Sequence, residues 1–96
     1  MSQATAITHV DNDQVRVTEW RFEAGAATGA HRHDYDYVVV PLGAGLLKAI
    51  AAAGETLAEL APGKAYFRKA GVEHDVLNAG NEPFAFVEIE LKDRPG

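Results

Sequence analysis

The stretch that decides the fold is GAATGAHRHDYDYVVVPLG, residues 25–43. Within it, His31 and His33 are separated by one residue, and the run DYVVVPL that follows is rich in side chains that favour strands. Because side chains two positions apart on a strand point to the same face, both imidazoles are expected to point the same way. Two neutral imidazoles placed like this suit a divalent transition metal. An isolated His-x-His pair is nevertheless weak evidence for a metal site, so further residues with matching spacing are needed to support it.

A second stretch, GKAYFRKAGVEHDVLN at residues 63–78, carries the third histidine of interest, His74. Its asparagine, Asn78, is expected to hold a tight turn through its side chain. Three glycines are likewise expected to serve turns: Gly25, Gly63 and Gly71. The fourth histidine, His9, stands alone near the N-terminus and is expected to be a surface side chain.

Turn residues divide the chain into short runs rich in Val, Ile, Phe, Tyr and Trp. These runs cover residues 14–22, 36–42, 64–69, 75–79 and 84–91. Many short strands at this spacing are typical of an all-β sandwich or barrel.

The last of these runs alternates with period two. Val87 and Ile89 fall on one face, and Glu88 and Glu90 fall on the other. The two glutamates could face a cavity as acids, but the alternation leads us to expect them on the outer, solvated side. A small domain needs its large aromatic side chains for burial, so we expect them in the core or in an interface. These are Trp20, Phe22, Phe67, Phe84 and Phe86. Two arginines, Arg21 and Arg68, are expected to be solvated or ion-paired.

Length and composition exclude several classes of function. A chain of 96 residues is room for one small domain, residues 1–96. Its net charge of −5 disfavours nucleic acid as a partner. No apolar run approaches the roughly 20 residues that cross a bilayer, and no secretory signal is visible, so we expect a cytoplasmic protein without a membrane partner. With no cysteine and a single serine, Ser2, the chemistry is left to histidine, carboxylate and tyrosine side chains.

In their spacing, the two stretches at 25–43 and 63–78 resemble the two motifs of the cupin superfamily, small β-barrels that hold a metal in the barrel mouth. The first motif is Gly, five residues, His-x-His, three or four residues, Glu, six residues, Gly. The second is Gly, five residues, Pro-x-Gly, two residues, His, three residues, Asn. The resemblance implies an all-β fold, a single cupin barrel of the double-stranded β-helix or jelly-roll type. The segments HRHDYDYVVVPL, AGVEHDVLNAG and FVEIELK are similar, more narrowly, to small bacterial cupins of β-alanine degradation.

The chain departs from these motifs at two positions. Lys69 replaces the proline of the second motif, which is a surface-turn change. The glutamate of the first motif is missing. Tyr37 stands at its place on the same strand face as the histidines, whereas Asp36 faces the other way unless a β-bulge turns it round. The resemblance therefore predicts His31, His33 and His74 as metal ligands, with Tyr37 lining the site or coordinating weakly and Asp36 in reserve.

Residues 46–61, LLKAIAAAGETLAELA, are rich in strong helix formers and by themselves suggest an amphipathic helix. The competing interpretation is a hairpin with strands at 46–52 and 56–60 that turns at residues 53–55. The resemblance to cupins leads us to expect the hairpin.

Three neutral imidazoles leave the charge of a divalent ion uncompensated, so the site should attract a small anionic metabolite, chiefly a carboxylate. The ion is one divalent transition metal, and the sequence does not choose among Fe, Ni, Zn, Mn and Cu. The resemblance implies a homodimer. Two functions remain open: a metal-dependent oxygenase or lyase/isomerase of amino-acid or carboxylic-acid catabolism, and a non-catalytic binding or metal-handling module. Candidate acids and bases are Tyr35, Asp36, Tyr37 and Glu73, which the sequence does not rank.

Overall fold

The regular elements of the protein are all β-strands. A computed structural model describes residues 2–92, and within that range it contains no helix. None of the described residues therefore belongs to a helix that could cross a bilayer. The described residues form nine strands: β1 (Thr5–Asp11), β2 (Val15–Phe22), β3 (His31–Arg32), β4 (Asp36–Pro41), β5 (Gly45–Ala51), β6 (Gly54–Leu60), β7 (Tyr66–Arg68), β8 (Glu73–Asn78) and β9 (Phe84–Leu91). The predicted all-β fold is confirmed, and four of the five predicted runs match strands β2, β4, β8 and β9 closely.

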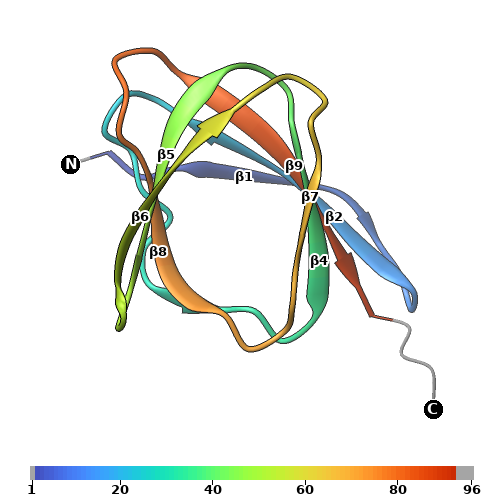
Figure 1. The fold of residues 1–96 in the computed structure, drawn as a ribbon. Helices are drawn as coiled ribbons and strands as arrows, with labels where there is room; N and C mark the ends of the chain where they lie inside the picture. Colours follow the sequence, from blue (N-terminus) through green and yellow to red (C-terminus); the bar gives the residue numbers. More distant parts are fainter. Residues whose placement is uncertain (1, 93–96) are drawn as a thin grey trace.

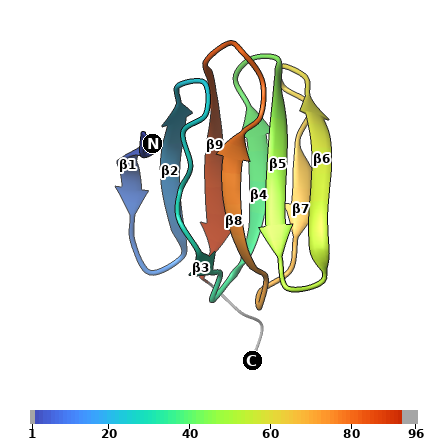
Figure 2. The ribbon, with the colours of Figure 1, turned by 90° about the vertical axis from the view of Figure 1, so that its left-hand side faces the viewer.

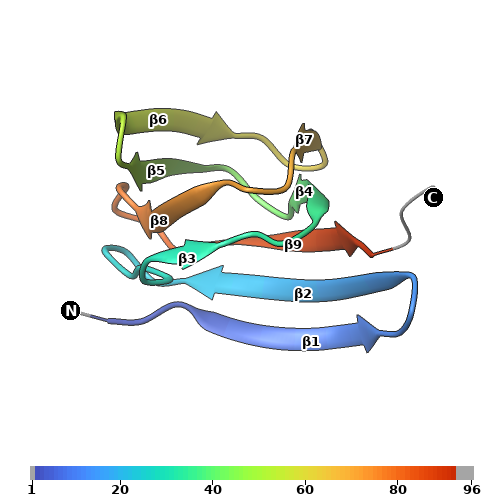
Figure 3. The same ribbon diagram turned by 90° about the horizontal axis from the view of Figure 1, so that it is seen from below.

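The strands form two antiparallel sheets that face each other (Figure 1). The five-stranded sheet has the order β1-β2-β9-β4-β7, and the four-stranded sheet has the order β3-β8-β5-β6. Figure 2 shows the smaller sheet in front of the larger one, with the strands nearly parallel to a common direction. Seen from below, β1 and β6 lie at opposite ends of the molecule (Figure 3), where each is an edge strand.

The helix-forming stretch is a hairpin, as expected from the resemblance. Strands β5 and β6 pair from Gly45↔Leu60 to Ala51↔Gly54, so the turn is tighter than predicted and begins one residue earlier. Gly54 has a φ of 134°, which favours glycine. On its other side β5 pairs with β8, from Leu47↔Asn78 to Ile50↔Asp75. This pairing within a sheet overrides the helix propensity of the alanines and leucines.

The expectation for β9 is wrong, because its inward face is the one that carries the glutamates. Phe84 and Phe86 are buried and lie within 5.5 Å of Phe22, measured between ring centroids. These aromatic contacts fix which face of β9 points inward, and the period of two then brings Glu88 and Glu90 inside as well.

The core lies between the two sheets and is built from aromatic and aliphatic side chains. Its buried members are Phe22, Ala26, Tyr37, Val39, Leu47, Leu60, Val76, Phe84 and Phe86, with Trp20 partly buried against them. Phe67 is not part of this core: on the short edge strand β7 it is 49% exposed, which leaves an interface as its expected place.

Candidate metal site

The three predicted ligands, His31, His33 and His74, come together although they are far apart in the sequence. His31 on β3 lies directly opposite His74 on β8 in the antiparallel pair. The backbone of His33 is tied to the segment before β8, because its N–H donates to Val72 O at 2.9 Å and its carbonyl accepts from Gly71 N at 2.8 Å. The backbone pairing of β3 with β8 thus sets the positions of all three rings.

The ring nitrogens converge on a common point. His33 Nε2 lies 3.1 Å from His31 Nε2 and 3.3 Å from His74 Nε2, and one ligand atom from each residue lies within 4.8 Å of the others. Donor atoms that share one ion, each at about 2.0–2.1 Å, lie about 3–4 Å from one another. The three histidines therefore could hold a metal ion.

Local contacts keep these imidazoles in the form that binds metals. His31 Nδ1 lies 2.8 Å from Gly29 O; since a carbonyl only accepts, Nδ1 donates and Nε2 keeps its lone pair for the site. Burial, and next the charge of His31, lower the pKa of both His33 and His74 to about 4. Both rings are therefore neutral near pH 7, as ligation requires.

Tyr37 lines the site, and Asp36 does not reach it. The Tyr37 ring is buried and stacks on His33, with ring centroids 3.9 Å apart and planes 21° from parallel. Burial raises the pKa of Tyr37 far above its ordinary value, so its hydroxyl keeps its proton. Asp36 Oδ1 instead accepts a hydrogen bond from Ala70 N at 2.8 Å. No β-bulge turns its side chain to the histidines, because β4 pairs with β9 in unbroken register.

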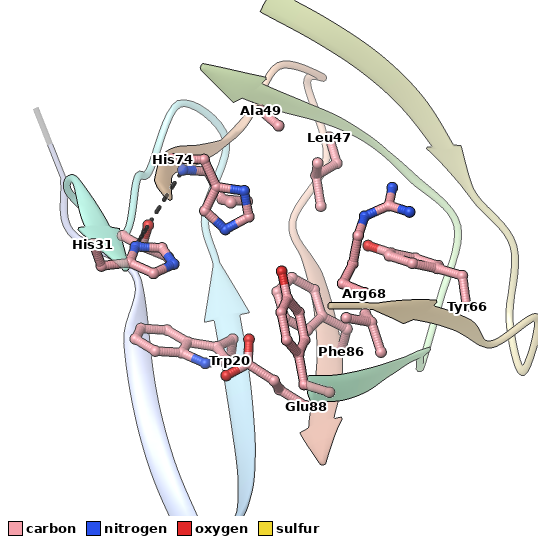
Figure 4. A pocket seen from close by; sticks show the side chains of 13 residues that line it. Trp20, His31, Leu47, Ala49, Tyr66, Arg68, His74, Phe86 and Glu88 are labelled. Carbon is pink, nitrogen blue, oxygen red and sulfur yellow. Dashed lines mark hydrogen bonds between the residues drawn. The ribbon is translucent and has the colours of Figure 1, made fainter. Parts of the chain in front are cut away.

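A small cavity opens beside the histidines (Figure 4). His31, His74 and Trp20 lie on one side of it, and Tyr66 and Arg68 lie on the other. Its volume is about 50 Å³, so it suits a molecule of few atoms. The remaining walls are mainly apolar, formed by Val39, Leu47, Ala49, Val76 and Phe86.

Two charged residues line the cavity, and one of them, Glu88, was expected on the solvated side. Glu88 is only 7% exposed, and its Oε2 lies 3.9 Å from His33 Nε2. Burial, and next the charge of Glu90, raise the pKa of Glu88 to about 7. Arg68 is exposed, as expected, and it also lies over the Tyr66 ring at 4.8 Å and lines the cavity. The signal that could have revealed Glu88 is its shared face with Phe84 and Phe86.

The remaining predicted roles are structural. Asn78 is buried, its Nδ2 donates to Glu82 O at 2.7 Å, and its Oδ1 accepts from Gly80 N at 2.9 Å, so it holds a turn as expected. His9 lies on the surface, 2.9 Å from Glu19. The three predicted turn glycines, Gly25, Gly63 and Gly71, all have positive φ.

Comparisons with known proteins, by sequence and by structure, both find cupins. The family model described as "Cupin domain" matches residues 18–90. The chain is 56% identical over 90 residues to the beta-alanine degradation protein BauB of Pseudomonas aeruginosa, covering 94% of this chain and 95% of that one.

Two solved structures illustrate the range of the fold. A cupin domain from Bordetella pertussis superposes with a TM-score of 0.93 at 46% identity and 96% coverage of both chains. The polyketide cyclase RemF from Streptomyces resistomycificus has a TM-score of 0.75 at 19% identity, covering 98% of this chain and 68% of that one, and shares the fold alone. With its two motifs on strands that pair with each other, β3 with β8 and β4 with β7, this chain belongs to the cupin family.

Proposed function

We propose that this protein binds one divalent transition metal through His31, His33 and His74 and uses the ion to hold a small carboxylate. The observation that carries the proposal is the convergence of three ligand atoms within 4.8 Å of one another. Three imidazoles are a donor set that suits iron, nickel, zinc or copper, and manganese remains possible with added oxygen ligands.

The cavity supports a carboxylate as the bound group. A divalent ion on three neutral rings attracts anions, and Arg68 adds a second positive charge at the same cavity. That charge is close enough to lower the pKa of His74, after burial and the charge of His31. A guanidinium pairs with a carboxylate through two parallel hydrogen bonds. A short molecule with a carboxylate therefore fits between the histidines and Arg68, with its carbon atoms against the apolar walls.

We further propose that the substrate is a small carboxylic acid of β-alanine breakdown, because the relative with 56% identity is named for that process. A bound metal would polarise a ligated carboxylate or activate water or dioxygen, as in an oxygenase or a lyase/isomerase. The cavity wall also presents a phenol, Tyr37, whose protonated hydroxyl can donate a hydrogen bond to a group bound beside the histidines. Such a donor beside the metal favours an enzyme over a binding module.

The metal site is tested by metal analysis of the untagged protein. We expect close to one transition-metal ion per chain, and almost none in the His31→Ala, His33→Ala and His74→Ala variants. His9→Ala is the matched control, because His9 lies on the surface and pairs with Glu19. Equal metal content in the wild type and in the three site variants would contradict the proposal.

The carboxylate site is tested by titrating the metal-loaded protein with β-alanine, propionate and 4-aminobutyrate. We expect Arg68→Gln to weaken binding by about 10-fold or more, the loss of one charged hydrogen-bonded pair. Arg21→Gln is the control, since Arg21 pairs with Glu19 outside the cavity. Binding that is unchanged in Arg68→Gln would show that this arginine does not hold the carboxylate.

Turnover separates the enzyme from the binding module. Oxygen consumption and product formation are measured with the iron-loaded protein across small carboxylates and thiols. Turnover that is lost in His31→Ala supports an enzyme, whereas tight binding of a carboxylate without any turnover supports the module.

A further inference from the structure

We propose that Glu88, on the last strand β9, is a fourth protein ligand of the metal and supplies the carboxylate that the first motif lacks. This inference rests on the proposed metal site. It assigns a ligand that lies outside both motifs, from the opposite sheet to that of His31 and His74.

The distance between Glu88 and His33 is compatible with a shared ion. Its Oε2 lies 3.9 Å from His33 Nε2, and two donors on one ion, each bonded at about 2.0–2.2 Å, lie no more than about 4.4 Å apart. Figure 4 shows the Glu88 side chain rising from β9 into the cavity, with its carboxylate below the His31 and His74 rings.

Neighbouring groups hold the Glu88 carboxylate in place. The strand that carries it is central in its sheet, with Glu88 paired to Thr18 on β2 and to Val39 on β4. The side chain of Trp20 lines the same cavity wall beside Glu88.

The other carboxylates near the histidines are engaged elsewhere. Glu90 makes a two-point contact with Arg16, at 2.9 and 2.7 Å. Asp36 accepts from Ala70 N, and Asp75 accepts from Gly29 N at 3.1 Å. Glu73 is exposed and lies 3.4 Å from Arg32. Glu88 alone among these combines burial, a place in the cavity wall and closeness to a histidine nitrogen.

A carboxylate ligand has a consequence for metal choice. Carboxylate oxygens suit harder ions such as Mn²⁺, whereas imidazole alone suits Cu²⁺ and Zn²⁺. Removing the Glu88 carboxylate should therefore weaken Mn²⁺ binding more than Cu²⁺ binding. It should also leave the ion with one more unit of uncompensated positive charge.

The experiment titrates metal-free protein with Mn²⁺ and with Cu²⁺, by calorimetry or chelator competition. We expect Glu88→Gln to lose about 10-fold or more in Mn²⁺ affinity and clearly less in Cu²⁺ affinity. Glu90→Gln is the matched control, because it removes another buried carboxylate of β9, one that is paired with Arg16. If the wild type binds Mn²⁺ no better than Glu88→Gln does, Glu88 is not a ligand, and the three-histidine site still stands. A wild type that binds neither ion overturns the proposed metal site, and this inference with it.

A second measurement uses only the wild-type protein, so it does not depend on the folding of a variant. In a crystal structure with Mn²⁺ bound, we expect a Glu88 oxygen about 2.2 Å from the ion, within bonding distance. A Glu88 carboxylate that lies more than about 3.5 Å away, with water in its place, would overturn the proposal.

Discussion

At the level of single residues, the site is a group of ionisable side chains whose charges depend on one another. Glu88 shows this dependence most clearly. Burial and the charge of Glu90 raise its pKa to about 7, while the hydrogen bond from Trp20 and the charge of Arg16 act in the opposite direction. The imidazole of His33 faces it at 3.9 Å. In the metal-free protein, Glu88 therefore holds a proton over a pH range in which an exposed glutamate has lost it.

This difference predicts a pH dependence of stability for the metal-free protein. Between 4.5, the ordinary pKa of a glutamate, and about 7, the unfolded chain binds fewer protons at Glu88 than the folded protein does. The Glu88 contribution to the free energy of unfolding therefore falls as the pH rises through this window, by on the order of 3 kcal/mol at most. Denaturant unfolding at a series of pH values measures it.

The comparison with Glu88→Gln isolates this contribution. His33 and His74, whose pKa values are lowered from 6.5 to about 4, act with the opposite sign, since the unfolded chain binds more protons there. Both proteins carry that contribution, so the difference between their unfolding free energies reports Glu88. A difference that stays constant from pH 4.5 to 7 would contradict the prediction.

The three histidines could be predicted from the sequence, whereas Glu88 was expected on the wrong side of its strand. Fixed spacing on strands and in turns sets where an imidazole points, so the motif distances carry geometric information. The position of Glu88 depends on which face of β9 turns inward. Alternation alone allows either face, and the burial of Phe84 and Phe86 against Phe22, on the face that Glu88 shares, decides between them.

At the scale of strands and turns, one glycine controls how closely the two sheets approach. A Cβ at Gly45, at the start of β5, would lie 2.6 Å from Phe84 Cδ2 and 2.9 Å from Phe84 Cβ. Phe84 is itself buried in the core. The first motif ends at Gly43, where a Cβ would meet nothing within 4 Å. The close approach therefore needs the glycine two positions beyond the motif.

These two glycines provide a matched pair of substitutions. We expect Gly45→Ala to destabilise the fold by about 1–3 kcal/mol, because the added methyl group displaces Phe84 from a filled core. Gly43→Ala should change stability by less than about 0.5 kcal/mol, the usual size for an open surface position. Thermal unfolding of both variants beside the wild type measures this. Equal melting temperatures for the two variants would contradict it.

The strands themselves were predictable to different degrees. β2, β4 and β9 have the β-branched and aromatic residues that strands favour, and they were found from composition and alternation. The hairpin of β5 and β6 has the composition of a helix. Its strands exist because β5 pairs with β8, a contact between distant parts of the chain. A resemblance to a family predicts such a contact, whereas the helix and strand propensities of neighbouring residues do not.

At the scale of the whole molecule, the barrel leaves apolar side chains uncovered at both ends. Ile7 and Val10 on β1 are 40% and 41% exposed, and Leu57 on β6 and Phe67 on β7 are 58% and 49% exposed. β1 is also exposed along its whole length and is an edge strand. Uncovered apolar edges are prone to pair with another chain, and a small domain gains stability by burying them.

We therefore expect a homodimer in solution, and sedimentation equilibrium should give about twice the chain mass of 10.3 kDa. Two double variants locate the interface: Ile7→Glu/Val10→Glu at the β1 end, and Leu57→Glu/Phe67→Glu at the β6–β7 end. A buried pair of added charges is costly, so the variant at the interface should sediment as a monomer while the other stays dimeric. Because both pairs lie outside the cavity, metal content should be unchanged in the variant that stays dimeric. A wild type that sediments as a monomer at micromolar concentration would contradict the prediction.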